Sequence, residues 1–225
     1  MIDSRPAWVS ERLKGGERVT IEIAPAEQTI LPEALPLNII YEDADLIVIN
    51  KAAGMIVHPV GVYKNGTLAN ALVYHWQMSQ QSASFHPVHR LDRLTSGLML
   101  VAKNPWAHQQ LSRQIEAGSF HRLYLAICQG NIRRSSAKII APLRHADTGF
   151  KWEIADEGNP AITRYRVLNN YPGAALLALK LFTGKTHQIR VHMASLGNPL
   201  WGDPIYGIPD PLFPRPALHA VQLAF

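Results

Sequence analysis

Short apolar stretches bounded by glycine, proline or polar residues recur along this chain of 225 residues. The stretches with a strand pattern lie at 39–41, 46–49, 98–102, 123–128, 161–168, 174–182 and 217–225. Helical spacing or helix caps occur at 67–76, 104–118 and 186–196. Because strands and helices do not alternate in βαβ order, an all-parallel sheet is disfavoured. The pattern predicts an α+β fold with a mixed, largely antiparallel central sheet flanked by helices and loops.

The beginning of the chain differs from the rest in charge and in proline content. Residues 1–50 carry nine acidic side chains against four Lys or Arg, whereas residues 51–225 carry eight against eighteen. A short strand pattern at 19–23 is followed by three prolines up to residue 36. We therefore predict that residues 1–36 form an N-terminal arm and that residues 37–225 form the main domain.

Composition limits the class of protein. A single cysteine excludes a disulfide framework and a thiolate zinc site. No apolar run approaches the roughly 20 residues of a membrane span, and the first residues lack the apolar core of a signal peptide. These features predict a cytoplasmic protein that does not contact a membrane.

Basic residues cluster in two stretches, 117–146 and 158–202, each with five Lys or Arg and no acid. Such a surface favours a polyanion, because cations that neutralise phosphates release condensed counterions. A solvated basic surface without a partner is the alternative.

The first motif with unusual chemistry is His89–Gly97, in which Asp92 lies between Arg90 and Arg93. Nearby positive charge favours the ionised carboxylate, which can then act as a nucleophile or accept a proton. The alternative is an Asp that caps the following backbone amides or pairs with an arginine.

The second motif covers residues 183–192. His187 and Arg190 are three residues apart in a predicted amphipathic helix at 186–196, so both could face one ligand. Lys185 follows Gly184 as in a phosphate-binding loop, but a Walker motif requires glycine where this chain has Leu179. We therefore expect no nucleotide cofactor; a solvated surface helix is the alternative.

In the third motif, Arg122 and Tyr124 alternate along a strand and point to the same side. An aromatic ring beside a cation is suited to stacking on a nucleobase and holding its phosphate, although core packing is the usual role of tyrosine. The ten histidines are scattered without metal-ligand spacing, so no metal site is expected. These residues alone predict an enzyme or binder that acts on nucleic acid with one activated carboxylate.

Beyond these patterns, the sequence HRLDRLTSGLMLVAK at 89–103 resembles the signature of the RluA-type RNA pseudouridine synthases. Residues 41–59 are similar to the first motif of that family. Further similarity follows in family order at 122–130, 158–168, 181–207 and 218–225. The resemblance implies isomerisation of uridine to pseudouridine in ribosomal or transfer RNA, with base flipping, without cofactor or metal, in a catalytic cleft across the sheet.

The resemblance also assigns roles. Asp92 would be the catalytic carboxylate, attacking C1′ or accepting the ribose 2′ hydrogen. Arg190 would form an ion pair with Asp92, and Tyr124 would stack on the target base and assist the late loss of the C5 proton. The residues expected to contact RNA are Arg90, Arg93, Arg122, Lys185, His187, Lys51 and His58.

Two further expectations and two alternatives remain. Residues 8–23 resemble the tail of a small RNA-binding domain found in some members of the family, so the arm would be a remnant of that domain. The protein is expected to be a monomer. An RNA-binding or RNA-folding factor on the same scaffold, without essential catalysis, is the first alternative. A hydrolase that uses Asp92 on nucleosides or sugars is the second, and it lacks an evident second acid in these motifs.

Overall fold

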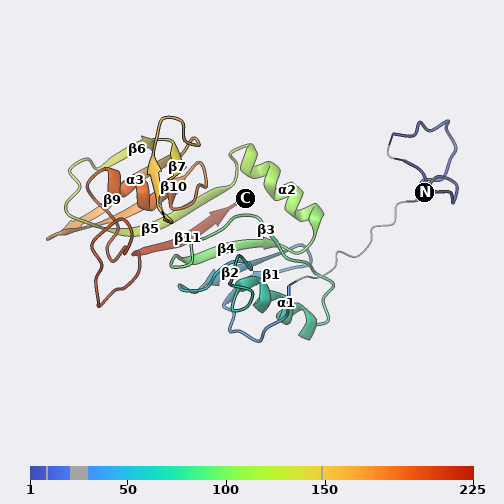
Figure 1. The fold of residues 1–225 in the computed structure, drawn as a ribbon, viewed down its shortest axis with the longest axis horizontal. Helices are drawn as coiled ribbons and strands as arrows, with labels where there is room; N and C mark the ends of the chain where they lie inside the picture. Colours follow the sequence, from blue (N-terminus) through green and yellow to red (C-terminus); the bar gives the residue numbers. More distant parts are fainter. Residues whose placement is uncertain (9, 21–29, 148) are drawn as a thin grey trace.

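The computed structural model describes residues 1–8, 10–20, 30–147 and 149–225 (Figure 1). Residues 21–23 of the predicted strand at 19–23 lie outside the described part. The helices are α1 (Leu68–Met78), α2 (Pro105–Glu116) and α3 (Gln188–Ser195). The strands are β1 (Ile39–Glu42), β2 (Leu46–Lys51), β3 (His86–Pro87), β4 (Ser96–Ala102), β5 (His121–Gln129), β6 (Ser136–Ile140), β7 (Leu143–His145), β8 (Trp152–Ile154), β9 (Ile162–Tyr171), β10 (Ala174–Leu181) and β11 (Leu218–Ala224).

Within the described residues, nine of these strands form one sheet. Its order is β1-β2-β4-β11-β5-β10-β9-β6, with β3 beside β4, while β7 and β8 pair separately. The pairing of β11 with β4 is parallel, and the other pairings in the sheet are antiparallel. The predicted α+β fold with a mixed, largely antiparallel sheet is therefore confirmed.

Gly97 allows the two halves of the sheet to join. It has a φ of +115° and lies opposite Ala220 in the parallel pair of β4 and β11. A Cβ atom at residue 97 would lie 2.3 Å from the carbonyl oxygen of Ala220. A residue with a side chain cannot occupy this position without moving β11 away from β4.

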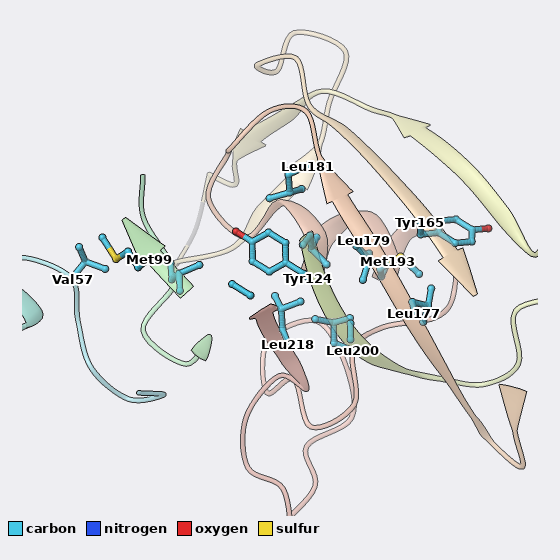
Figure 2. Packing of buried hydrophobic residues seen from close by; sticks show 14 of the residues in the cluster. Val57, Met99, Tyr124, Tyr165, Leu177, Leu179, Leu181, Met193, Leu200 and Leu218 are labelled. Carbon is cyan, nitrogen blue, oxygen red and sulfur yellow. The ribbon is translucent and has the colours of Figure 1, made fainter. Parts of the chain in front are cut away.

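The helices divide between the two faces of the sheet. On one face, Leu72 of α1 and Met193 of α3 belong to a cluster that includes Met99, Tyr124 and Leu179 (Figure 2). On the other face, α2 packs on β4 through a second cluster, formed by Leu100, Ala102, Ala107, Leu111 and Phe120. The first face, which contains Tyr124, carries the site described below.

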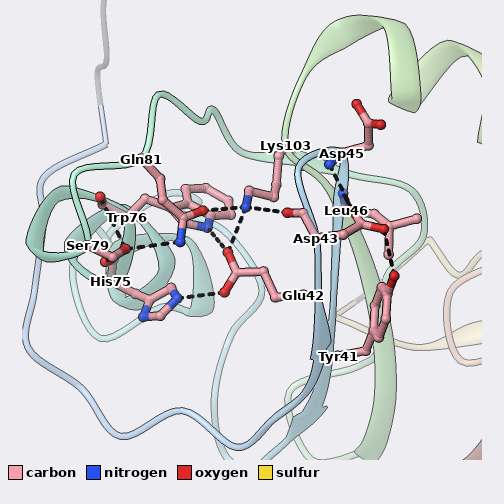
Figure 3. A network of polar contacts seen from close by, with 10 residues as sticks. All are labelled: Tyr41, Glu42, Asp43, Asp45, Leu46, His75, Trp76, Ser79, Gln81 and Lys103. Carbon is pink, nitrogen blue, oxygen red and sulfur yellow. Dashed lines mark hydrogen bonds and ion pairs between the residues drawn. The ribbon is translucent and has the colours of Figure 1, made fainter.

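Polar contacts fasten α1 to the edge of the sheet (Figure 3). The Glu42 carboxylate accepts a hydrogen bond from Trp76 Nε1 at 3.0 Å, contacts His75 Nε2 at 2.8 Å and pairs with Lys103 Nζ at 2.8 Å. Burial raises the pKa of Glu42, but these hydrogen bonds outweigh it and the pKa is lowered. The ionised carboxylate thus links α1 to β1 and to the end of β4.

The amphipathic helix predicted at 186–196 differs from the structure. The helix spans Gln188–Ser195, and residues 188–193 are all buried. His192 is buried because its ring contacts Thr163 Oγ1 at 2.9 Å and the carbonyl oxygen of Ala141 at 3.0 Å. The alternative of a solvated surface helix is therefore excluded, because these partners cover the polar side of the helix.

The described residues 1–8 and 10–20 contact one another. Ile2 bridges to Val19 and to Arg5, and the Asp3 carboxylate accepts a hydrogen bond from the backbone nitrogen of Arg18. None of the helices in the described part of the chain is long and apolar enough to cross a bilayer.

Candidate active site

A pocket of about 300 Å³ opens where the loop before β4, the start of β5 and the N-terminal end of α3 meet. Seven of the ten predicted site residues line it: Arg90, Asp92, Arg122, Tyr124, Lys185, His187 and Arg190. Three segments that are distant in sequence therefore contribute to one concave site, as expected for a ligand site.

The Asp92 carboxylate is partly accessible in this pocket, with 25% of its side chain exposed. Arg190 Nη1 lies 3.6 Å from Asp92 Oδ2, so the predicted ion pair is present. A turn closed by a 3.1 Å hydrogen bond from the Thr95 nitrogen to the Asp92 carbonyl oxygen holds the backbone. The pair holds the Asp92 carboxylate in the pocket lining beside a fixed cation.

Arg190 makes its shortest contacts with Asp203. Its Nε and Nη2 donate to the two Asp203 oxygens at 2.7 and 2.8 Å, and the Asp203 side chain is completely buried. Burial alone would lower the pKa of Arg190, but the hydrogen bonds to Asp203 and the charge of Asp92 raise it. Asp203 thus fixes the guanidinium by two bonds, and Nη1 is the nitrogen that reaches Asp92.

Tyr124 packs into the cluster and forms the floor of the pocket. Figure 2 shows its hydroxyl turned away from Leu179 and Met193. Burial raises the pKa of Tyr124 to about 12; Arg122 opposes this shift and Asp92 adds to it. At neutral pH the ring is therefore a neutral phenol, which can stack or donate a hydrogen bond.

Arg122 lies beside Tyr124 in the pocket wall and is almost fully buried. Its guanidinium carbon lies 5.9 Å from the centroid of the Phe120 ring, and its Nε has no hydrogen-bond partner among the described residues. Burial lowers the pKa of Arg122. This cation is placed for a group inside the pocket rather than for a phosphate that runs over the surface.

His187 precedes α3 in a left-handed conformation, with a φ of +56°. Its Nδ1 lies 2.9 Å from the hydroxyl of Tyr206, which itself accepts a hydrogen bond from the backbone nitrogen of Trp152. Burial lowers the pKa of His187, while Asp92 and Arg190 act in opposite directions. The contact with Tyr206 therefore orients the His187 ring at the edge of the pocket.

Asp203 and Tyr206 were not among the predicted site residues. Both lie in the segment 181–207 that also supplies Arg190, and the Tyr206 ring centroid lies 5.0 Å from the Arg190 guanidinium carbon. The signal in the sequence is that Asp203 is the first acid after the acid-free stretch 158–202. A lone acid beside several cations is a candidate ion-pair partner.

Lys51 does not lie where RNA could reach it, and the prediction of an RNA contact was wrong. The side chain is 1% exposed, and Nζ donates to the carbonyl oxygens of Ala52, Met55 and Arg93 at 2.8, 2.9 and 3.3 Å. Burial lowers the pKa of Lys51 to about 8. Lys51 instead ties the loop after β2 to the residue that follows Asp92, because all three of its donors are used there.

The other predicted RNA contacts lie at the edge of the pocket or outside it. Arg90 is exposed, with Nη2 3.4 Å from Thr186 Oγ1, and Lys185 is half-buried in the pocket lining. Arg93 is exposed, with its guanidinium carbon 5.6 Å from the Tyr63 ring centroid. His58 is half-buried in a separate hollow, and burial lowers its pKa. The pocket therefore has exposed cations on one side of its opening.

Metal ligation was also considered. Within the described residues, no three His, Cys, Asp or Glu side chains are grouped to hold a metal ion. His89, the first residue of the motif at 89–97, is buried; its Nε2 accepts a hydrogen bond from the Leu100 nitrogen at 3.2 Å, and burial lowers its pKa to about 3. His89 is thus a neutral structural residue.

Comparison with known proteins gives consistent results. A family model described as RNA pseudouridylate synthase matches residues 45–195. The ribosomal large subunit pseudouridine synthase D of Nitrosomonas europaea is 41% identical, over 99% of this chain and 68% of that protein. An uncharacterized RNA pseudouridine synthase of Aquifex aeolicus is 40% identical, over 93% of this chain and 68% of that protein. Among solved structures, human RNA pseudouridylate synthase domain containing 1 has a TM-score of 0.68 at 29% identity, covering 85% of this chain and 79% of that one.

Proposed function

Because this chain belongs to the RNA pseudouridylate synthase family, we propose that Asp92 is its catalytic carboxylate and that Arg190 and Tyr124 assist it. The chain is an RNA pseudouridine synthase, so it breaks the bond between C1′ and N1 of a uridine and joins C1′ to C5. The observation that supports the role of Asp92 is its partly exposed carboxylate, 3.6 Å from Arg190 Nη1, in the pocket that Tyr124 floors.

Two routes use the same carboxylate. In one, Asp92 attacks C1′ as the base leaves; the base then turns, C5 attacks C1′, and the carboxylate is released. In the other, Asp92 takes the proton from C2′ as the base leaves, which forms a double bond between C1′ and C2′, and it returns the proton to C2′ as C5 attacks C1′. In both routes C5 then loses its proton and N1 gains one. Both routes need an ionised Asp92, and the Arg190 guanidinium, 3.6 Å away, is placed to pair with that anion.

Tyr124 is proposed to hold the detached base while it turns. A neutral phenol ring in the pocket floor offers an apolar stacking surface that permits rotation about the stacking axis. The hydroxyl can donate a hydrogen bond to the uracil or take part in removal of the C5 proton. Arg122 and His187 line the same pocket and are candidates to stabilise negative charge on the departing base.

The target nucleotide must leave the RNA stack to reach Asp92, because C1′ is inaccessible within a helix. Arg90 and Arg93 are exposed next to the pocket, on both sides of Asp92 in sequence. We assign them to the phosphates on either side of the flipped nucleotide or to the gap that it leaves.

We propose that the substrate is large-subunit ribosomal RNA rather than transfer RNA. The support is the name of the Nitrosomonas relative, which matches 99% of this chain at 41% identity. This substrate would place the enzyme in the cytoplasm. We also propose that residues 1–36 form an N-terminal arm of the catalytic domain of residues 37–225, since the described residues of the sheet begin at Ile39. The end of this arm is attached to the domain, because the Leu31 carbonyl oxygen and the Glu33 carboxylate accept hydrogen bonds from Asn70 and Gly66.

An activity assay with Asp92→Asn tests the proposal. Wild-type protein is incubated with unmodified large-subunit rRNA and with tRNA transcripts, and pseudouridine is mapped by carbodiimide adducts and primer extension. We expect a new adduct in rRNA with wild type and at least a ~10³-fold slower reaction with Asp92→Asn, which has nearly the same shape and so should retain RNA binding. Normal turnover by Asp92→Asn would remove Asp92 from catalysis, and modification of tRNA alone would refute the ribosomal substrate only.

A further inference from the structure

A row of cations crosses the sheet on the face opposite to Tyr124. Lys138 on β6 lies opposite Arg164 on β9, and Arg164 lies opposite Lys180 on β10. Since neighbouring strands are about 4.8 Å apart, the three backbone positions lie within roughly 10 Å. Like charges directly opposite each other destabilise a sheet, so packing does not explain the row.

This cation row faces solvent. In the described part of the chain, α1 and α3 pack on the other face of the sheet, and α2 packs on β3 and β4. Lys138 and Arg164 are exposed, and Arg164 borders a hollow in the uncovered half of this face together with Arg166 and Lys180. The strands β6, β9 and β10 contain no acidic residue. The face therefore presents positive charge to a partner.

The charges of the row are not neutralised within the described residues. The ion pairs of the described residues lie outside the row. Their cations are Arg5, His75, Lys103, Arg144 and Arg190. The three cations of the row and the neighbouring Arg166 have no acidic residue between them. They fit a polyanion such as an RNA backbone better than a protein surface of mixed charge.

Phe182 connects the cation row to the active-site pocket. Its side chain follows β10, is 47% exposed and contributes to the pocket lining. The amino groups of Lys138 and Lys180 lie 5.4 and 5.5 Å from the centroid of its ring. An exposed ring with two adjacent ammonium groups combines a stacking surface for a base with contacts for the phosphates beside it.

We propose that single-stranded RNA next to the target nucleotide leaves the pocket across Phe182 and lays its phosphates on Lys138, Arg164 and Lys180. The base adjacent to the flipped uridine, or the next one, stacks on the Phe182 ring. This inference rests on the proposed function, because the flipped uridine must occupy the pocket for its neighbour to reach Phe182. A flexible single strand suits the site since its bases are free to stack on aromatic side chains.

The salt dependence of RNA binding tests the row. The Kd for an rRNA fragment that contains the target uridine is measured at several salt concentrations for wild type and for a triple variant with Lys138→Gln, Arg164→Gln and Lys180→Gln. The binding constant falls as the salt concentration rises, and each phosphate contact on a single strand adds about 0.7 to the steepness of log K against log salt. The slope of the triple variant should therefore be less steep than that of wild type by about 2. Phe182→Ala should raise the Kd about tenfold, within the range for one base stacked on an aromatic ring.

Matched variants separate these effects from a change in net charge. Lys138→Arg with Lys180→Arg keeps the charges and should retain the wild-type slope. Arg144→Gln removes one charge from a side chain already paired with Glu153 at 2.7 Å and should leave RNA binding unchanged. Removal of like charges should not lower the melting temperature; if the triple variant nevertheless fails to fold, Lys180→Gln alone should reduce the slope by about 0.7.

The outcomes distinguish this inference from the proposed function. If wild type forms pseudouridine but the neutral variants bind RNA with the wild-type slope and Kd, the row does not bind RNA, and a protein partner becomes the better explanation of this face. If wild type forms no pseudouridine in any RNA, the proposed function itself fails. A loss of slope in Lys138→Arg with Lys180→Arg would also contradict the inference, because charge would not be the cause.

Discussion

The buried pair between Arg190 and Asp203 gives a quantitative prediction for Asp203→Asn. The substitution keeps the shape and one oxygen, which can still accept hydrogen bonds from the backbone nitrogens of Ile205 and Tyr206. It removes the negative charge and one of the two acceptors for Arg190, which is itself only 3% exposed. The guanidinium then keeps a buried charge with the more distant Asp92 carboxylate as its remaining anion.

The expected loss of stability follows from that geometry. Removing one partner of a buried, well-formed ion pair costs about 3–5 kcal/mol. In a chain of this size each kcal/mol lowers the melting temperature by about 2–4 °C, so we expect a decrease of roughly 10 °C. Because Arg190 also contacts Asp92, a displacement on the order of 1 Å should slow pseudouridine formation about 100-fold.

Thermal unfolding followed by circular dichroism and single-turnover assays at saturating RNA measure the two effects. Asp210→Asn is the matched control: its carboxylate is half-buried and accepts a hydrogen bond from Trp201 Nε1 at 2.6 Å, and it has no cationic partner among the described residues. This control should change neither the melting temperature nor the rate appreciably. If Asp203→Asn unfolds at the wild-type temperature and reacts at the wild-type rate, the argument that Asp203 positions Arg190 is refuted.

Three other measurements test the fold and the buried titratable groups. Gly97→Ala should prevent stable folding because its Cβ would lie 2.3 Å from the Ala220 oxygen, whereas Gly173→Ala, also at positive φ but with open space, should cost only about 1–2 kcal/mol by chemical denaturation. Burial lowers the pKa of His89 to about 3, so between about pH 6.5 and pH 3 this side chain binds a proton only in the unfolded protein. The free energy of unfolding should therefore decrease as the pH falls through this range, with a contribution from His89 of up to about 1.4 kcal/mol per pH unit. His89→Gln should remove that contribution. Burial raises the pKa of Cys128 to about 12, so iodoacetamide should label it only in denaturant, and rapid labelling of the folded protein would contradict its burial.

Local patterns predicted seven of the eleven strands in the described residues, missed β3, β6, β7 and β8, and could not predict how the strands pair. The apolar stretches at 98–102 and 174–182 correspond to β4 and β10, since alternation and β-branched or aliphatic content depend on neighbouring residues alone. The insertion of β11 between β4 and β5 depends on the close approach at Gly97 and Ala220, which are distant in sequence. Periodicity therefore established the class of fold and left the strand order to the structure.

The site shows the same division. The family motifs singled out Asp92, Tyr124 and Arg190, and the structure brings them to one pocket, although no spacing rule links residues from three separate segments. Lys51 was assigned wrongly because residue type indicates charge but not exposure. Its amino group is buried since nearby backbone carbonyls satisfy all three donors, and such partners are visible only in three dimensions.

Exposure also limits what the two acid-free basic stretches can do. Of their ten cations, Arg190 pairs with Asp203, Arg144 pairs with Glu153, and Arg122 is buried in the pocket wall. Seven cations remain for surface phosphates, so these stretches can contribute no more than about 5 to the salt slope of single-strand binding. In the proposed mechanism the buried Arg122 and Arg190 line the pocket while exposed cations are available to RNA phosphates, and a count of Lys and Arg does not separate the two groups. A measured slope far above this limit would require further cations, such as Arg90 and Arg93 near the pocket.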